Sequence, residues 1–301
     1  MAHSYKRVER FLDAAREPTK ELIPIEGYEK THLMTLEQSL QPMLGKLHNL
    51  ETMIKIAMRN SRKPANGLTS DESAAIHLHT MQWPETYASL YVTLNEALRC
   101  ENRECLIPWF PYLKLFFTAL YKLPSFKGTI WRGVRGNFSG MFDEDIIWWG
   151  MSSCTEKFSM IENFLGVDGE RTLLKIDCVN GKAIQAHSYF EKEEEILLMP
   201  GTYLQIVGKI RPSKNLNVVH LQEVSGPYQT IAAPFDTSSA SANLGSLEPS
   251  VIFKEPTKVS TAPTTSEKIY GENCFTFFCK SVLEKADIEV LSRLRQGHFL
   301  N

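Results

Sequence analysis

The sequence predicts an α+β fold, in which a helical first half is followed by a run of strands. Between residues 69 and 121 apolar residues recur at helical spacing, whereas from residue 129 onward short segments alternate apolar and polar side chains. Helices that precede strands, instead of alternating with them, favour the α+β class. With 301 residues and 43% hydrophobic composition, the chain is long enough to bury a full core.

The helical half contains a recognisable helix start. Thr69-Ser70-Asp71-Glu72 is typical of a capping box, with Thr69 as the N-cap and Glu72 at the third helical position, and the apolar run 74–81 follows it. A second helix is predicted at 90–98 and a third at 109–121, after Pro108. We expect these helices to face a common core.

The second half is predicted to form short strands at 129–134, 146–149, 171–178, 183–185, 195–198, 202–210 and 216–224. Asp168-Gly169 and Asn180-Gly181 have the composition of tight turns, so we expect the chain to reverse at both places.

Four regions are predicted along the chain. A helical extension at 1–66 precedes a domain at 67–228, and the Ser-, Thr-, Ala- and Pro-rich stretch 229–270 is predicted to be a linker. The segment 271–301 is predicted to form an amphipathic helix, because apolar residues recur on one face from Val282 to Leu294 before Gly297. Two roles stay open for that helix, packing on its own protein and docking to a partner.

The composition indicates which kinds of binding partner and which location to expect. Lys plus Arg (33) nearly balance Asp plus Glu (35), so no long-range field favours nucleic acid or an anionic membrane. The apolar stretch 106–123 contains prolines and lysines, and we expect no membrane span there. The cysteines show no CxxC pairing and the N-terminus has no apolar signal segment, which together favour a reducing, cytoplasmic location.

Three segments carry candidate chemistry. The segment 128–135 sets Arg132 inside an apolar strand, beside Gly133, where a ligand can approach the backbone. The segment 148–155 passes from tryptophans to small hydroxyl and thiol side chains around Ser153. Each has a plain structural alternative: a strand arginine whose charged end reaches solvent, and a strand end that caps a helix.

The third segment, 189–200, runs carboxylates into an apolar strand. On a strand Glu193 and Glu195 would point to the same side, roughly 6 to 7 Å apart. Like charges held that close are typical of sites that handle a proton or a cation, although a solvated charged edge is the alternative.

Metal binding is not predicted. His77 and His79 are two positions apart on a predicted helix, so their side chains diverge. Cys100 and Cys105 also lack the spacing of a ligand set. Cys154 has no histidine partner nearby in the sequence that would make it a nucleophile.

Taken in order, Trp-Arg-Gly, aromatic-x-Ser-x-Thr and Glu-x-Glu resemble the arginine-specific mono-ADP-ribosyltransferases of the R-S-E class. The resemblance covers residues 68–224. It implies a split β-sandwich that encloses a nicotinamide adenine dinucleotide (NAD) cleft, flanked by an N-terminal helical lobe. It also makes 67–228 the catalytic domain.

The resemblance implies roles for individual residues. Arg132, Ser153, Glu193 and Glu195 match the family's catalytic positions, and Arg132, Gly133 and Ser153 are expected to bind NAD. A bidentate guanidinium at Arg132 suits the dinucleotide phosphates. Phe164 either stacks on nicotinamide or belongs to the core.

Glu195 is expected to stabilise an oxocarbenium-like ribose, oriented by Ser153. Glu193 is expected to align an acceptor guanidinium and take up its proton, next to an acceptor-recognising turn formed by Tyr189 and Phe190.

The expected function is transfer of ADP-ribose from NAD, as co-substrate and without metal, to an acceptor protein with an exposed arginine. Two departures from the family pattern stand out: Ser153-Cys154-Thr155 replaces Ser-Thr-Ser, and His79-Thr80 stands where many relatives carry Tyr-Thr. Two alternatives therefore stay open, an NAD glycohydrolase and a non-catalytic module that senses NAD or binds a partner.

Overall fold

The computed structural model describes residues 17–18, 20–84, 86–165 and 169–235, without the side chains of 162–164. All of these belong to the first of two compact units, residues 1–240. The predicted helix at 271–301, and the predicted linker from residue 236 onward, lie outside the described residues.

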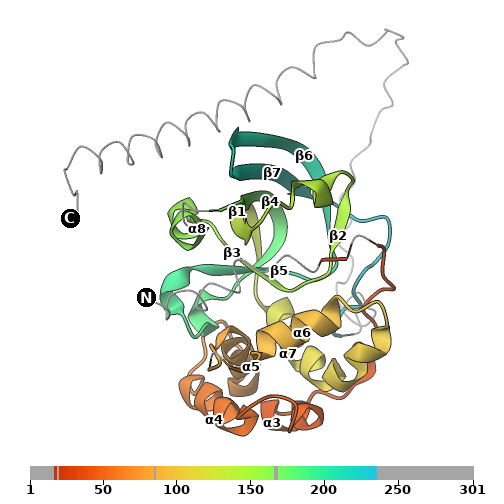
Figure 1. Ribbon diagram of the computed structural model, residues 1–301. Helices are drawn as coiled ribbons and strands as arrows, with labels where there is room; N and C mark the ends of the chain where they lie inside the picture. The colour runs from red at the N-terminus through yellow and green to blue at the C-terminus, as the bar shows by residue number, and fades with distance from the viewer. Residues whose placement is uncertain (1–16, 19, 85, 166–168, 236–301) are drawn as a thin grey trace, which may run out of the picture. The chain divides into compact units, whose positions relative to one another are not determined.

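Helices precede strands along the described chain (Figure 1). The helices before the first strand are η1 Tyr28–Lys30, α3 Leu36–Ser39, η2 Gln41–Met43, α4 Leu50–Asn60, α5 Ser70–Thr80, α6 Leu90–Leu98, η3 Arg103–Trp109 and α7 Phe110–Lys122. The strands are β1 Ser125–Arg135, β2 Ile146–Trp148, β3 Ser152–Thr155, β4 Arg171–Ala183, β5 Glu195–Leu198, β6 Thr202–Ser213 and β7 Leu216–Glu223. Short helices lie between strands at η4 Ser139–Phe142, α8 Phe158–Leu165, η5 Gln185–His187 and η6 Glu191–Glu193. The α+β prediction is confirmed.

The predicted start of α5 is also confirmed. The Thr69 hydroxyl accepts a hydrogen bond from the Glu72 N–H (3.2 Å), and the Glu72 carboxylate accepts one from the Thr69 N–H (2.9 Å). This reciprocal cap satisfies two backbone donors that the first turn leaves without partners. From that start α5 runs between α4 and α7, and its side chains are buried on nearly every face.

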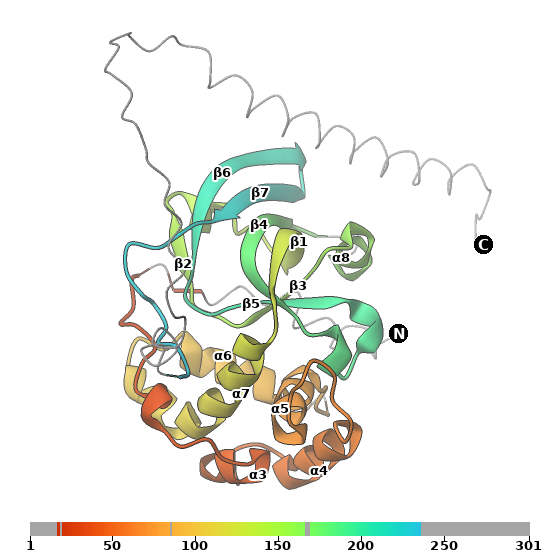
Figure 2. The same ribbon diagram turned by 180° about the vertical axis from the view of Figure 1, so that it is seen from behind.

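The helices that precede β1 form one lobe (Figure 2). Their apolar side chains share one core, which also includes Trp149 and Leu197 from the strand half. Leu36, Leu40 and Ile54, which precede residue 67, share that core with α5, α6 and α7. The division of the chain at residue 67 therefore stays a prediction.

The strands form two layers around a second apolar core. β1 pairs antiparallel with β4 along its length, and it also pairs with β3 where Trp131 meets Thr155. β5 closes the circuit, because it pairs with both β3 and β4. From β4 the sheet continues through β7 and β6 to β2, and the side chains of Ile130, Trp148 and Leu174 fill the space inside. This arrangement agrees with the split β-sandwich that the resemblance implies.

The predicted turn at Asn180-Gly181 is wrong. β4 runs without a break through both residues as far as Ala183, and Gly181 pairs with Phe126 of β1. The predicted strand 183–185 is therefore wrong, because Ala183 ends β4 and Gln185 begins η5. A Cβ at Gly181 would lie 2.8 Å from Ile196 Cγ2 and 2.9 Å from Cys178 Sγ. The glycine is therefore explained by close packing between β4 and β5 and not by a chain reversal.

The segment 148–155 also differs from the prediction. β2 ends at Trp148, and Ser152 begins β3. Neither Ser152 nor Ser153 is therefore a helix cap. The Trp148 indole N–H donates to the Ser152 hydroxyl (2.9 Å), which ties the end of β2 to the start of β3.

Within the described ranges, no helix combines the length and the apolar character needed to cross a membrane.

Candidate active site

The layer made by β3 and β5 presents two different faces. Cys154 and Ile196 point inward and belong to the apolar core of the sandwich. Directly paired residues share a face, and Thr155 pairs with Glu195, so Ser153, Thr155 and Glu195 lie together on the opposite face. The strand register therefore brings two of the predicted site residues, Ser153 and Glu195, into contact.

The Glu195 carboxylate is fully buried, with 0% of the residue exposed. Its Oε1 accepts a hydrogen bond from the Ser153 hydroxyl, and its Oε2 accepts one from the Ser188 hydroxyl (3.2 Å). The Ser188 oxygen in turn accepts from the Phe190 N–H (3.1 Å). Hydroxyl donors thus hold both carboxylate oxygens, which fixes their direction.

Ser188 was missed by the sequence analysis. Its signal is its place directly before the Tyr189-Phe190 pair and close to the acids. Where Cys154 replaces a hydroxyl of the family's Ser-Thr-Ser segment, Ser188 supplies a further hydroxyl from a different part of the chain.

Glu193 does not share a strand with Glu195, so the predicted same-face geometry is wrong. Glu193 ends the short helix η6, and β5 begins only at Glu195. Between them Glu194 adopts a left-handed backbone (φ 44, ψ 50), which breaks the alternation of side chains. The Glu194 carboxylate forms an ion pair with Lys157, just after β3, and this contact supports the strained residue. Glu193 itself is buried, at 3% exposure.

The turn that contains Tyr189 and Phe190 is docked on α5. The Tyr189 N–H donates to the Thr80 hydroxyl (2.8 Å), and the His77 ring lies 5.5 Å from the Tyr189 ring, edge to face. Tyr189 is nevertheless 45% exposed, and its ring meets Phe190 at 4.9 Å and nearly perpendicular. The pair therefore presents an aromatic surface beside the acids.

Two buried histidines complete this docking. His77 Nδ1 donates to the His187 carbonyl (3.2 Å), and its Nε2 accepts from the Asn60 amide (3.1 Å). His187 Nε2 donates to Asn66 Oδ1 (3.1 Å), and its Nδ1 accepts from the Ser73 hydroxyl (2.9 Å). Burial lowers the pKa of both histidines, although the carbonyl of His187 opposes this for His77. The neutral rings thus join the turn to the helical lobe.

Arg132 lies on the inner face of β1, with Ile130 and Val134, and not on the face of Glu195. Its guanidinium is fully buried, its Nη1 donates to the Ser153 carbonyl (2.7 Å), and its Cζ lies 6.0 Å from the centre of the Trp148 ring. In this position the arginine supports β3 at Ser153 from inside the sandwich. Its predicted contact with NAD phosphates stays a prediction.

Cys154 lies beside this arginine in the core. Burial raises the pKa of its thiol to about 12, although the Arg132 charge acts in the opposite direction. A thiol that stays protonated is a poor nucleophile.

Gly133, which was also predicted to bind NAD, lies on the outer face of β1. Gly133 pairs with Leu173 of β4 and shares its face with Trp131, whose ring packs edge to face against Phe158 of α8 at 5.2 Å. Phe164 belongs to α8, but its side chain lies outside the described residues, so its contact with nicotinamide stays a prediction.

No group of three or more metal-ligating side chains occurs among the residues that the structure describes. His79, for example, packs between the rings of Tyr91 and Phe116 in the helical lobe, away from His77.

A β-sandwich beside a helical lobe, with the buried Glu195 held by one hydroxyl from β3 and one from the segment between η5 and η6, agrees with the ADP-ribosyltransferase resemblance. The model of the NAD:arginine ADP-ribosyltransferase family matches residues 28–226, which is more than half of the chain. The chain belongs to this family, and it transfers ADP-ribose from NAD.

Solved structures similar to the chain include bacterial and eukaryotic ADP-ribosyltransferases. Vis of Vibrio splendidus, in complex with agmatine, shares 19% identity over 69% of this chain and 96% of its own, with a TM-score of 0.45. HopU1 of Pseudomonas syringae shares 19% over 74% and 98%, with a TM-score of 0.44. The eukaryotic enzyme ART2.2 shares 17% over 69% and 98%, also at 0.44. No curated protein sequence matches the chain.

Proposed function

We propose that the protein is a mono-ADP-ribosyltransferase that modifies arginine side chains of an acceptor protein and releases nicotinamide. The observation that carries the proposal is the Glu195 carboxylate, which is fully buried and held by the hydroxyls of Ser153 and Ser188. The second acid, Glu193, is buried nearby in the segment that also carries the exposed ring of Tyr189.

In the cleavage step the bond between C1′ of the ribose and the nicotinamide nitrogen breaks. The electron pair leaves with nicotinamide, and positive charge develops at the ribose. A fixed carboxylate at Glu195 stabilises that charge, because its hydrogen bonds hold it in place before the charge appears. Burial strengthens the effect, since little water competes at the carboxylate.

In the transfer step a guanidinium nitrogen of the acceptor attacks C1′ and loses a proton as the new bond forms. Arginine is protonated at neutral pH, so a second carboxylate is needed to align the group and accept the proton. We assign that role to Glu193. The aromatic surface of Tyr189 and Phe190 suits the stacking of a planar guanidinium and gives this segment its recognition role.

Arg132 and Gly133 complete the proposed site from β1. We assign Arg132 the support of β3 through the Ser153 carbonyl, and Gly133 a close backbone approach of NAD on the outer face.

The test is an incubation of the whole chain with NAD labelled in its adenylate part, with agmatine as the simplest guanidinium acceptor. Nicotinamide release and labelled agmatine are measured in the same tube. Release matched by labelled agmatine is the expected result. Release with only free ADP-ribose would make the protein an NAD glycohydrolase, and NAD left intact would make it a non-catalytic module. Either outcome overturns the proposal.

A further inference from the structure

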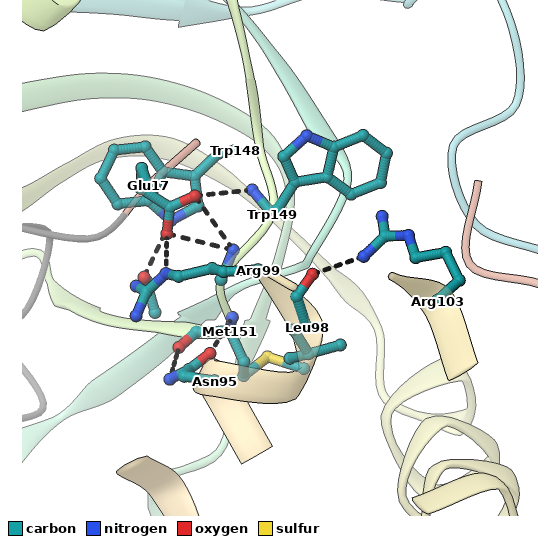
Figure 3. A network of polar contacts seen from close by, with 10 residues as sticks. Glu17, Asn95, Leu98, Arg99, Arg103, Trp148, Trp149 and Met151 are labelled. Carbon is teal, nitrogen blue, oxygen red and sulfur yellow. Dashed lines mark hydrogen bonds and ion pairs between the residues drawn. The ribbon is translucent and has the colours of Figure 1, made fainter. Parts of the chain in front are cut away.

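The turn between β2 and β3, residues 149–151, is held by a carboxylate from far upstream in the chain (Figure 3). Glu17 Oε2 accepts from the Trp149 N–H (2.9 Å), and both carboxylate oxygens lie within 3.3 Å of the Gly150 nitrogen. The Glu17 side chain is only 2% exposed. A backbone turn with buried N–H groups needs such acceptors, and the Glu17 side chain supplies them for Trp149 and Gly150.

The charge of Glu17 is balanced by Arg99, which follows α6. Arg99 Nε lies 2.5 Å from Glu17 Oε1, and the arginine side chain is 4% exposed. One helical turn earlier, the Asn95 amide donates to the Met151 carbonyl (2.9 Å), and its oxygen accepts from the Met151 N–H (2.7 Å). The Glu17 carboxylate and the end of α6 thus fix every residue of the turn.

The space between these groups admits no additional atom. A Cβ at Gly150 would lie 2.4 Å from Glu17 Oε1 and 2.5 Å from Arg99 Nη2. On the far side of the turn, the Arg103 guanidinium lies 4.5 Å from the centre of the Trp149 ring. The turn is therefore enclosed on several sides, and its position depends on Glu17.

The turn leads directly into the functional strand. Ser152 begins β3 and accepts from the Trp148 indole, and Ser153 contacts the Glu195 carboxylate. A displacement of residues 149–151 would move the Ser153 hydroxyl relative to Glu195, and small displacements of catalytic groups have large effects on rate.

We propose that Glu17 is a positioning residue for ADP-ribosyl transfer: paired with Arg99, it sets the place of the β2–β3 turn and thereby the contact between Ser153 and Glu195. The inference rests on the proposed function of that contact. Glu17 lies before the segment 28–226 that the family model matches.

The test combines kinetics with amide hydrogen exchange on the full chain. Glu17→Ala is expected to lower kcat for nicotinamide release by about tenfold, with KM for NAD changed by less than about twofold, after correction for the folded fraction. Glu17→Gln keeps one acceptor and is expected to retain more activity. In both variants, exchange should rise in peptides covering 148–155 and stay unchanged in α5 and α7.

Charge balance gives a rescue experiment. Arg99→Gln leaves the Glu17 carboxylate buried without its countercharge, so it should be more harmful than the double variant Glu17→Gln with Arg99→Gln, in which both groups are neutral.

The exposed ion pair of Lys20 and Glu101 is the matched control. It joins the same two stretches of chain at 3.6 Å, with side chains 76% and 69% exposed. Glu101→Gln should change neither kcat nor exchange.

Two results would overturn the inference: kcat and exchange of Glu17→Ala equal to those of the unaltered protein, or a loss of protection spread evenly over the chain. If the unaltered protein does not cleave NAD, the proposed function fails. The exchange of 148–155 in Glu17→Ala then still decides whether Glu17 positions the turn.

Discussion

Glu195 and Glu193 are close neighbours in the chain, but they lie in two differently built regions. Glu195 begins β5, whose backbone pairs with β3 on one side and β4 on the other. Glu193 ends a single helical turn in a segment that is held to α5 by side-chain contacts from His77 and Thr80. The first region is fixed by backbone pairing around a core, and the second by a few side chains.

The comparison teaches where the proposed mechanism places each half of the reaction. In that mechanism, breaking the nicotinamide bond needs a carboxylate that does not move, and we assign this to the closed circuit of strands. Receiving an acceptor protein needs an exposed surface, and we assign this to the turn with Tyr189. The predictions below test this division.

The largest effect is expected on the strand side. Glu195→Gln keeps the size of the side chain but removes the charge opposite the oxocarbenium, so turnover should fall on the order of a hundredfold or more. NAD binding, measured by calorimetry, and the melting temperature should stay close to those of the unaltered protein. A variant that consumes NAD at nearly the normal rate would remove Glu195 from the reaction.

On the turn side, Glu193→Gln should separate two activities. Labelling of agmatine should fall by at least about tenfold, because the guanidinium loses its proton acceptor, whereas cleavage of NAD by water should continue. The matched control is Glu191→Gln, an exposed acid in the same helical turn, which should leave both activities intact.

Equal loss of transfer and hydrolysis in Glu193→Gln would contradict the division, since it would place Glu193 in the cleavage step. Nicotinamide release and agmatine labelling therefore have to be measured on the same preparation.

Arg132→Lys tests whether the inner face of β1 supports the strand region. Lysine cannot reproduce the planar guanidinium that reaches the Ser153 carbonyl in the core, so the free energy of unfolding should fall by about 2 kcal/mol. Urea titration measures this loss, and calorimetry measures NAD affinity. Unchanged stability with weakened NAD affinity would instead favour direct contact with the dinucleotide phosphates.

The smallest effect concerns pH, and it should reach the turn before it reaches β3 and β5. Burial lowers the pKa of His77 and His187, so both are neutral in the folded protein, whereas in the unfolded chain they gain a proton below their ordinary value of 6.5. The stability that depends on their neutral form is complete above pH 6.5 and is lost as pH falls below it. Protection against hydrogen exchange, corrected for the intrinsic exchange rate at each pH, should therefore fall in peptides covering 187–193 at a higher pH than it falls in β3 and β5.

His187→Gln removes one of the two titrating groups and should weaken this acid response. An equal response in the strands would contradict the assignment to the turn.

The starts of β5 and α5 could be predicted from sequence, because their signals are local. The apolar run after Glu195 indicates the start of β5, and the capping box indicates the start of α5. The left-handed backbone at Glu194 could not be predicted, because residues other than glycine adopt it uncommonly and no signal in the neighbouring sequence marks this glutamate. Asn180-Gly181 has turn composition, but packing against Ile196 determines its conformation.

The contacts of Ser188 and Glu17 could not be predicted either. Ser188 contacts an acid seven residues further on, whereas Glu17 acts across more than a hundred residues, and neither forms a recognisable motif with its neighbours. Only the folded chain reveals that each provides a partner to a group near Ser153.

The left-handed junction at Glu194 has a consequence for how such an enzyme diversifies. Because the direction of the chain changes at this one residue, residues between Ser188 and Glu194 can be exchanged without altering the register of β5 after it. In the proposed function, the residues that recognise the acceptor can therefore vary while Ser153, Ser188 and Glu195 stay the same.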